Sequence, residues 1–193
     1  MAITEVARTW YLRPQDLPDD VDPSGLELTA GYKALRDSGT FSYAAHACTV
    51  SVDTESGAVR ILDYAVCEDG GVLVNPMIVD GQIIGGVAQG IGTALYEEMT
   101  FDAAGQPSAA TLADYALPGA MEVPVLRIDH METPSPYTRF GQKGIGEGGA
   151  IGPPAAIANA VNDALRPLGA RVDRLPITAH RVVAAILKAG RAA

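Results

Sequence analysis

Two stretches of the chain alternate apolar and polar residues in the manner of β-strands. The first is Tyr43–Asp53, the second is Ala58–Val66, and the short segment Thr54–Gly57 that joins them ends in glycine. Strands joined by a short glycine-containing turn typically form an antiparallel hairpin. Two further segments are strand candidates, because Glu27–Tyr32 alternates weakly and Val123–Glu132 lies in a proline-bounded stretch. The pattern therefore predicts a small sheet built around one hairpin.

A longer segment, Met77–Met99, follows the period of an α-helix and is reached through the loop Cys67–Pro76. Its larger apolar residues are spaced by three, four and four positions, as on one buried helix face: Ile84, Val87, Ile91 and Leu95. Five glycines also lie inside this segment, and each costs a helix roughly 1 kcal/mol relative to alanine. Close packing or a ligand must therefore stabilise the predicted helix.

Three more helices are predicted. Ile3–Leu12 fits a short helix. Pro153 and Pro154 suit the first turn of another helix, whose buried stripe is Ile157, Val161 and Ala164/Leu165. The last helix is Ala179–Lys188, with Thr178 as its N-cap. Helices and strands that do not alternate regularly indicate an α+β fold.

The composition is that of a globular protein. The chain has 193 residues, of which 48% are hydrophobic and 19% charged, so it can bury a core. Its net charge of −9, with no basic run, argues against binding to nucleic acid or to a membrane surface. There is no charged-then-apolar leader and no apolar run of about 18 residues. We therefore expect a cytoplasmic protein, unless a partner carries an export signal.

Cysteine usage argues against a metal centre held by this chain alone. Cys48 and Cys67 are the only cysteines, and they form no CxxC or His-rich motif of the kind that binds zinc or an iron–sulfur cluster. No metal ligands are therefore assigned. Two buried free thiols are the preferred interpretation, and a disulfide between them is the alternative. With 21 glycines and 6% aromatic residues, the chain suits close backbone packing, part of it against another subunit.

Residues 141–154 are unusually rich in glycine, with six glycines around one base, Lys143, and one acid, Glu147. Glycines before a helix N-terminus leave N–H groups that suit a phosphate or an oxyanion. The phosphate-loop pattern GxxxxGK[ST] is absent, so ATP or GTP binding is not supported. Glu147 is flanked by glycines and is either a solvated surface charge or an active-site base. Taken alone, this stretch favours the simpler interpretation, a glycine-rich connection with two solvated charges.

Polar side chains on the predicted helices leave similar alternatives. Gln82 and Gln89 are seven positions apart, two helical turns, so they project from one face. An amide offers both a donor and an acceptor and suits the edge of a heterocycle, whereas exposed helix polarity is the simpler interpretation. His46, His130 and His180 lie in different elements without metal-ligand spacing, so each is interpreted as a core or surface histidine.

Ten segments occur in a fixed order and together are specific. They are His46–Asp53, Val59–Leu62, Val74–Pro76, Gly81–Gln82, Gly85–Gly92, Leu95–Glu98, Asp114–Pro118, Glu132–Pro136, Gly141–Glu147 and Ala155–Ala160. Their order and spacing resemble the C-terminal part of the molybdenum-binding large subunit of the xanthine dehydrogenase, aldehyde oxidase and aerobic carbon monoxide dehydrogenase family. Any one glycine motif would be weak, but the resemblance extends over essentially the whole chain, to about Ile186.

The resemblance implies roles for particular residues. Glu147, the acid of the KGxGE motif, corresponds to the family's general base beside molybdenum. Gln82, which follows the glycine at the start of the helix, corresponds to a residue on the cofactor side of the site. Lys143, Gly144 and Gly146 correspond to the loop that shapes the active-site wall and are expected to bind the cofactor.

The resemblance also implies a fold and a reaction. The fold would be the second half of the molybdopterin-binding domain, with an antiparallel hairpin and glycine-rich helices packed on a sheet. The cofactor would be molybdenum–molybdopterin, in its cytosine dinucleotide form, shared with a partner chain. FAD and [2Fe–2S] clusters would be carried by other subunits. The expected reaction is hydroxylation of an aldehyde or an N-heteroaromatic compound, with water as the oxygen source.

The chain departs from the family in length, because family large subunits are several times longer. Residues 1–40, which include a proline-punctuated loop at 13–25, are expected to be an irregular segment that leans on a partner chain. Residues 41–193 would be the C-terminal portion of the cofactor-binding domain. The chain is then either a naturally split subunit or a truncated form, active only with the chain that carries the N-terminal part of the molybdenum subunit.

A second departure concerns the loop Cys67–Gly71, where Cys-Glu-Asp-Gly-Gly replaces the more usual Asp-Cys-Gly-Arg. The role of this loop is therefore open. The alternative to a hydroxylase subunit is a non-catalytic binding or assembly module that retains the fold without the cofactor. The joint presence of Gln82, Lys143 and Glu147 favours the enzyme.

Overall fold

A computed structural model describes residues 1–33, 36 and 39–191, and the chain divides into two compact units, Met1–Ala34 and Leu35–Ala193. The first unit contains helix α1 (Ile3–Leu12), as predicted, and then one 3₁₀ turn, η1 (Pro14–Asp16). The weak strand predicted for Glu27–Tyr32 is wrong. That segment has no regular secondary structure, and the described residues of its unit contain no strand that could pair with it.

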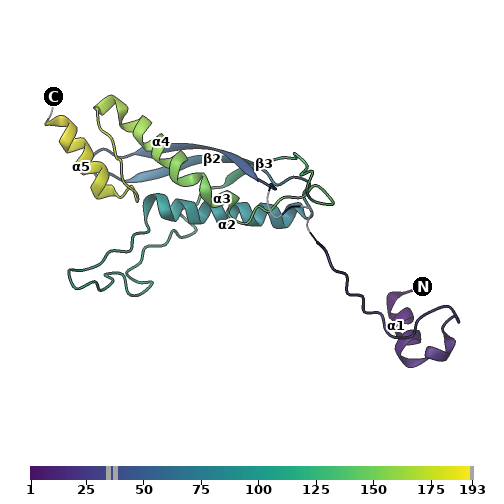
Figure 1. The fold of residues 1–193 in the computed structure, drawn as a ribbon. Coiled ribbons are helices and arrows are strands. Elements are labelled where there is room, and N and C mark those ends of the chain that lie inside the picture. The colour runs from purple at the N-terminus through teal and green to yellow at the C-terminus, as the bar shows by residue number, and fades with distance from the viewer. Residues whose placement is uncertain (34–35, 37–38, 192–193) are drawn as a thin grey trace. The chain divides into compact units, whose positions relative to one another are not determined.

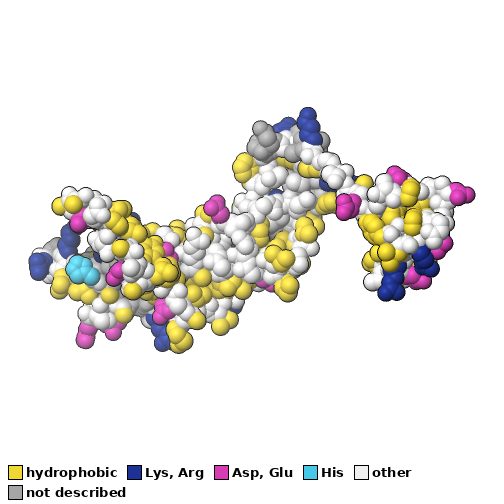
Figure 2. Space-filling model, turned by 90° about the horizontal axis from the view of Figure 1, so that it is seen from below, with side chains coloured by type: hydrophobic (Ala, Val, Ile, Leu, Met, Phe, Trp, Pro, Cys, Tyr) yellow, Lys and Arg dark blue, Asp and Glu magenta, His cyan; other side chains and the backbone are white. Residues whose placement is uncertain are grey.

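The first unit leaves large apolar side chains in contact with solvent. Ile3 is 86% exposed, Leu12 74% and Leu28 92%, and hydrophobic side chains gather on the surface of this lobe at the right of Figure 2. Exposed apolar patches commonly mark surfaces that contact another protein. That residues 1–40 lean on a partner chain stays a prediction, which this surface supports.

The second unit is built on a three-stranded sheet in the order β1-β2-β3. Strands β1 (Tyr43–Val52) and β2 (Val59–Asp69) form the predicted antiparallel hairpin, and β3 (Leu126–Met131) pairs with β2 in parallel. The sheet is therefore mixed. Strand β2 extends three residues further than predicted, so Cys67, Glu68 and Asp69 belong to the strand and not to a loop.

Helices cover one face of this sheet (Figure 1). They are α2 (Pro76–Leu95), the short α3 (Gly148–Ile151), α4 (Pro153–Leu165) and α5 (Ala179–Gly190). The fold of this unit is α+β, as predicted. No helix within the described ranges is both long and apolar enough to cross a membrane.

Residues at the N-termini of these helices determine where each helix begins. The Asn75 side chain caps α2 by accepting a hydrogen bond from the Ile78 N–H at 3.3 Å. Pro153 and Pro154 occupy the first turn of α4, where a missing N–H costs nothing. Thr178 caps α5, as predicted, with its hydroxyl accepting from the Arg181 N–H at 3.4 Å.

The core lies between β2 and the inner faces of the helices. Its buried apolar residues are Tyr64, Val66, Ile83, Val87, Ile91, Ala94, Leu95, Ile157, Val161, Leu165, Ala170, Val172, Ile177 and Val182. The buried stripe of α2 therefore begins at Ile83. The prediction of Ile84 is wrong, since that side chain is 45% exposed, and the helix also ends at Leu95, earlier than the predicted Met99.

Two glycines of α2 allow close approach of the helix that follows the glycine-rich segment. A Cβ on Gly86 would lie 2.9 Å from backbone atoms of Gly149 and Ala150, and one on Gly90 would lie 2.7 Å from the Pro153 ring. Both distances are too short for a real contact. Gly86 and Gly90 therefore position α3 and the start of α4 against α2.

We predict that Gly86→Ala lowers the free energy of unfolding by about 1–3 kcal/mol, because α3 must move away from α2. Gly81→Ala is the matched control, since a Cβ there meets nothing within 4 Å and alanine is favoured over glycine by up to about 1 kcal/mol in a helix. Urea unfolding of the two variants measures the difference. Equal stabilities would contradict the packing role of Gly86.

Candidate functional site

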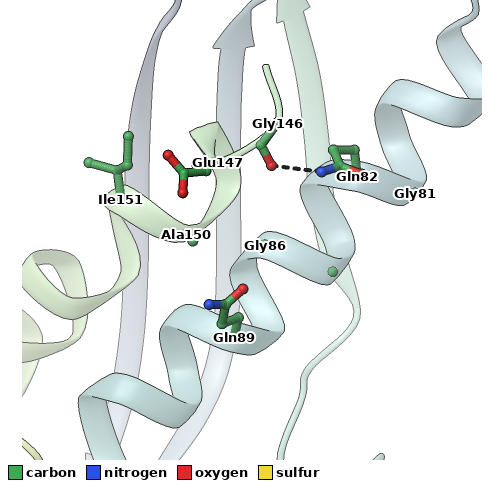
Figure 3. Close-up of a pocket in the computed structure, with 9 residues that line it drawn as sticks. Gly81, Gln82, Gly86, Gln89, Gly146, Glu147, Ala150 and Ile151 are labelled. Atoms are coloured by element: carbon green, nitrogen blue, oxygen red, sulfur yellow. Dashed lines mark hydrogen bonds between the residues drawn. The ribbon is translucent and has the colours of Figure 1, made fainter. Parts of the chain in front are cut away.

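A cavity of about 350 Å³ lies between the outer face of α2 and the turn that carries α3. Its walls are formed by Gly81, Gln82, Gly85, Gly86, Gln89, Gly146, Glu147, Ala150 and Ile151. Figure 3 shows the two glutamines on α2 and Glu147 on the opposing turn. Two segments more than fifty residues apart in sequence thus form one site.

The two glutamines share this cavity because of their spacing. Positions seven apart return to the same face of an α-helix, and both Gln82 and Gln89 line the cavity, as that spacing predicts. The Gln82 Nε2 donates a hydrogen bond of 2.6 Å to the Gly146 carbonyl oxygen (Figure 3). Gln82 therefore ties the glycine-rich segment to α2.

The glycines of α2 serve two purposes. Gly86 and Gly90 allow close packing, whereas a Cβ on Gly81 or Gly85 would meet nothing within 4 Å. Gly81 and Gly85 both line the cavity, so their missing side chains leave space there. The sequence suggested close packing or a ligand as the reason for these glycines. Close packing accounts for Gly86 and Gly90, whereas Gly81 and Gly85 leave space for a ligand.

Glu147 is the one ionisable side chain among the residues that line the cavity. It occupies the N-cap position of α3 with φ −111° and ψ 0°, but its side chain does not cap the helix. The side chain is exposed to solvent, and Figure 3 shows its carboxylate projecting from the turn. The carboxylate can therefore reach a ligand bound between α2 and α3.

Lys143 is placed differently from the other predicted site residues. Its side chain is 7% exposed and its Nζ lies 3.1 Å from the Asp69 carboxylate, whose side chain is fully buried. The ammonium also lies 5.2 Å from the centre of the Tyr43 ring. Lys143 therefore joins the glycine-rich segment to β2 and does not line the cavity of Glu147.

The Asp69 carboxylate is held in its charged form by several donors. Burial by itself would raise the pKa of Asp69, but hydrogen bonds from Thr133, Gly71 and Lys143 outweigh it and hold the pKa below its ordinary value. The segment Cys67–Gly71 thus ends a strand, and its Asp69 anchors two loops.

Gly144, His46 and His130 do not line this cavity. Gly144 is exposed and does not line it. His46 Nδ1 lies 2.9 Å from the Tyr64 hydroxyl, and His130 Nε2 lies 2.7 Å from an Asp80 carboxylate oxygen. Across the described part of the chain, no group of three or more His, Cys, Asp and Glu side chains could hold a metal ion.

The thiols are free and half-buried. Burial, followed by the charge of Asp63, raises the pKa of Cys48 to about 11, so this thiol stays protonated at neutral pH. The prediction of free thiols is confirmed, but the prediction that both are buried is not, since each is partly exposed. The cavity between α2 and α3 offers amides, backbone and one carboxylate to a ligand, a donor set for a polar organic group more than for a bare metal ion.

The chain matches known cofactor-binding proteins. The family profile described as molybdopterin cofactor-binding domain matches residues 1–124. The nicotine 6-hydroxylase large subunit of Paenarthrobacter nicotinovorans is 43% identical over 185 residues, which are 96% of this chain and 22% of that protein. The carbon monoxide dehydrogenase large chain of Hydrogenophaga pseudoflava is 36% identical over 162 residues, 83% of this chain and 20% of that protein.

A solved structure agrees with these relatives. The crystal structure of quinoline 2-oxidoreductase from Pseudomonas putida 86 superimposes with a TM-score of 0.80 at 41% identity, covering 97% of this chain and 24% of that one. The chain belongs to the molybdopterin cofactor-binding domain family of molybdenum hydroxylase large subunits. It spans about a fifth of the length of the curated relatives it matches.

Proposed function

We propose that this chain is the part of a molybdenum hydroxylase that brings the general base, Glu147, to the cofactor. The observation that carries the proposal is that Glu147, Gln82 and Gln89 line the same cavity as the open glycines Gly81 and Gly85. The reaction would be hydroxylation of an aldehyde or an N-heteroaromatic substrate with water as the oxygen source. Relatives named as a nicotine hydroxylase and a quinoline oxidoreductase support the heteroaromatic class.

The residues of the cavity fit a molybdopterin group. The primary amides of Gln82 and Gln89 present donors and acceptors to a pterin edge or a cofactor oxygen, and the backbone at Gly81 and Gly85 leaves room for close approach. When bound, the cofactor would supply the two-electron redox chemistry and the activated water-derived oxygen. Gly146 would shape the wall, held in place by the hydrogen bond from Gln82.

In this proposal Glu147 takes up the proton that the water-derived oxygen loses as it becomes bonded to the substrate carbon. A carboxylate must be ionised and close to the reacting atoms for that task. Its exposed position at the cavity supplies the access. Lys143 would act from a distance, because its ion pair with Asp69 fixes the loop that leads to Glu147. Gly144 would contact the cofactor only where that loop meets the rest of the enzyme.

The partners are proposed from the relatives. One is named a subunit gamma of a dehydrogenase complex and another a large chain, so we infer a chain that carries the remainder of the molybdenum subunit, an FAD subunit and a [2Fe–2S] subunit. The cofactor would be the cytosine dinucleotide form, shared between this chain and that remainder. We also propose a cytoplasmic location for the complex.

Affinity purification of this chain from its source, followed by metal analysis, tests the proposal. We expect a larger partner to copurify and the complex to contain molybdenum. A stable metal-free monomer would instead favour the alternative, a non-catalytic binding or assembly module. The outcome does not depend on knowing the substrate.

The open glycines give a second test. We predict that Gly85→Ala leaves the stability of the chain unchanged or raises it by up to about 1 kcal/mol, while the purified complex loses molybdenum, because the new methyl group projects into the cavity. Molybdenum content per complex and thermal unfolding of the chain measure the two effects. Full molybdenum content in Gly85→Ala would contradict placement of the cofactor against α2.

A further inference from the structure

A second cavity, of about 280 Å³, lies on the other side of α3 from the first. It is lined by Ser42, Tyr43, Ala44, His46, Glu68, Gly148, Ile151 and Gly152. Glu68 is only 1% exposed, and within the described residues neither of its carboxylate oxygens has a hydrogen-bond partner. The buried Nε2 of His46 is likewise without a partner there. Two buried polar groups that lack hydrogen-bond partners among the described residues thus face the same cavity.

The sheet register explains why they lie together. Glu68 pairs with Ala44, and His46 pairs with Val66, so Glu68 and His46 are diagonal neighbours on the same face. Diagonal neighbours across an antiparallel pair lie about 7–8 Å apart, and Glu68 and His46 both line the second cavity, where a water molecule can bridge their side chains. His46 already uses Nδ1 on its other diagonal neighbour, the Tyr64 hydroxyl, at 2.9 Å.

Helix α3 is shaped to cover these two side chains. A Cβ on Gly148 would overlap the Glu68 carboxylate, and a Cβ on Gly152, one turn later, would overlap the His46 ring. Any larger residue at either position would displace the buried group. The glycines that flank the Glu147 turn therefore have a second use, which is to admit Glu68 and His46 directly beneath it.

A route to solvent continues from Glu68 on its other side. His130 of β3 is the register partner of Glu68, and its Nε2 lies 2.7 Å from an Asp80 oxygen of α2, whose side chain is 47% exposed. The other ring nitrogen of His130, Nδ1, is buried and has no partner within the described residues. Titratable groups from three elements thus form a row from beneath α3 to the surface.

Such a row is not explained by packing. A buried polar group without a partner destabilises the fold, and protein interiors usually place ordered water at such points. Burial raises the pKa of Glu68, an effect that the neighbouring His130 partly opposes, and burial lowers the pKa of His46. A carboxyl group whose pKa is raised by one influence and lowered by another can both bind and release a proton.

The two cavities meet at α3. Ile151 lines both, Glu147 lines the first, and Gly148, the next residue, lines the second. We propose that Glu68 is a proton-relay residue for Glu147, receiving protons through water held in the second cavity and passing them by way of His130 and Asp80 to solvent. This inference rests on the proposed function of Glu147 as the base.

The proton balance of the proposed reaction gives such a route a task. Converting a C–H bond to C–OH with water as the oxygen source removes two electrons and releases two protons; the electrons leave through the redox cofactors. Glu147 is neutral after taking up one proton and must lose it before it can act again. In the relay, the O–H bond of Glu147 breaks as a water O–H forms, that water releases another proton to the Glu68 carboxylate, and Glu68 passes it to His130.

The test compares Glu68→Gln with wild type in the assembled molybdenum enzyme, by single-turnover and steady-state kinetics. Glutamine keeps the size of Glu68 but cannot hold a proton. The first turnover does not require Glu147 to be reset, so we expect its rate to be unchanged. Steady-state turnover is expected to fall roughly tenfold, less than the loss of a direct base would cause, with KM and molybdenum content unchanged.

Glu132→Gln, which removes an exposed carboxylate near the end of β3, is the matched control and should match wild type in both measurements. Unchanged steady-state turnover in Glu68→Gln would overturn the relay, and an equal slowing of both rates would show a structural role instead. If Glu68→Gln does not assemble, Glu68→Asp is measured instead. It keeps an acid at that position, so steady-state turnover should stay close to wild type, and a tenfold fall there would contradict the relay.

A readout independent of turnover is the infrared spectrum of the reduced complex. We expect a protonated-carboxyl band that appears on reduction in wild type and is absent from Glu68→Gln, and no such loss in Glu132→Gln. A band that persists in Glu68→Gln contradicts the relay. A normal first turnover in Glu147→Gln would instead contradict the proposed function, so the two failures are distinguishable.

Discussion

Glu147→Gln is expected to reduce turnover by roughly 10²–10⁴-fold, the usual contribution of a general base, while molybdenum content and subunit assembly stay normal. The substitution replaces a carboxylate oxygen with an amide nitrogen of nearly the same size. The side chain is exposed and does not cap α3, so no packing or capping contact is lost. A selective loss of the chemical step is therefore the signature of a base.

Glu55→Gln is the control, because it removes one exposed carboxylate of the β1–β2 turn, in an element that does not line either cavity. It should show wild-type kinetics. Near-normal turnover in Glu147→Gln would remove this residue from the role of base, and loss of molybdenum would show that it holds the cofactor instead. Rapid-reaction kinetics with metal analysis separates these outcomes.

Spacing within one helix was enough to predict that two residues of the cavity lie on the same face, although exposed helix polarity was the simpler interpretation. Gln82 and Gln89 share a face because of their seven-residue separation, and the need to offset the glycines of α2 was visible from helix propensity alone. What spacing could not predict is which glycine serves which purpose. That division depends on where α3 crosses α2, at Gly86 and not at Gly85.

Glu68 was missed for a different reason. The alternation along the chain predicts a second strand that ends at Val66, which leaves Glu68 in a loop where a carboxylate would be solvated. In the structure β2 continues to Asp69, and pairing with β3 buries this strand end. A usable signal was present, since Tyr64, Val66 and Glu68 continue the alternation of the strand. Because Glu68 is charged, it interrupts the apolar pattern, and the strand is predicted to end before it.

The one-residue error at Ile84 has a similar origin. An apolar pair at positions 83 and 84 fits the helical period about equally well in either register. Only the position of the sheet decides that Ile83 is fully buried while Ile84 is 45% exposed. Helices α4 and α5, whose ends carry prolines or an N-cap threonine, were predicted closely because local chemistry fixes where they begin.

The buried pair of Lys143 and Asp69 should be the most sensitive structural feature of the glycine-rich segment. Lys143→Met removes the cation and leaves the Asp69 carboxylate uncompensated in a fully buried position. Breaking one partner of such a pair costs about 3–5 kcal/mol. We expect that loss in the free energy of unfolding, measured by urea denaturation of the chain at neutral pH.

A double variant shows whether the charge is the cause. Lys143→Met with Asp69→Asn removes the uncompensated charge and should recover much of the stability lost in Lys143→Met. The same pair predicts acid sensitivity in wild type. Because the pKa of Asp69 is lowered in the folded state, its contribution is present above the unfolded pKa, about 4, and is lost as the pH falls through the lower folded value.

Unfolding measured at pH 7 and pH 3 should therefore show a smaller acid-induced loss in Asp69→Asn than in wild type. The comparison also separates two roles for Lys143. If its role is to fix the loop before Glu147 through Asp69, Lys143→Met and Asp69→Asn should reduce stability and turnover together. A Lys143→Met variant of normal stability that lacks molybdenum would show that its amine contacts the cofactor directly.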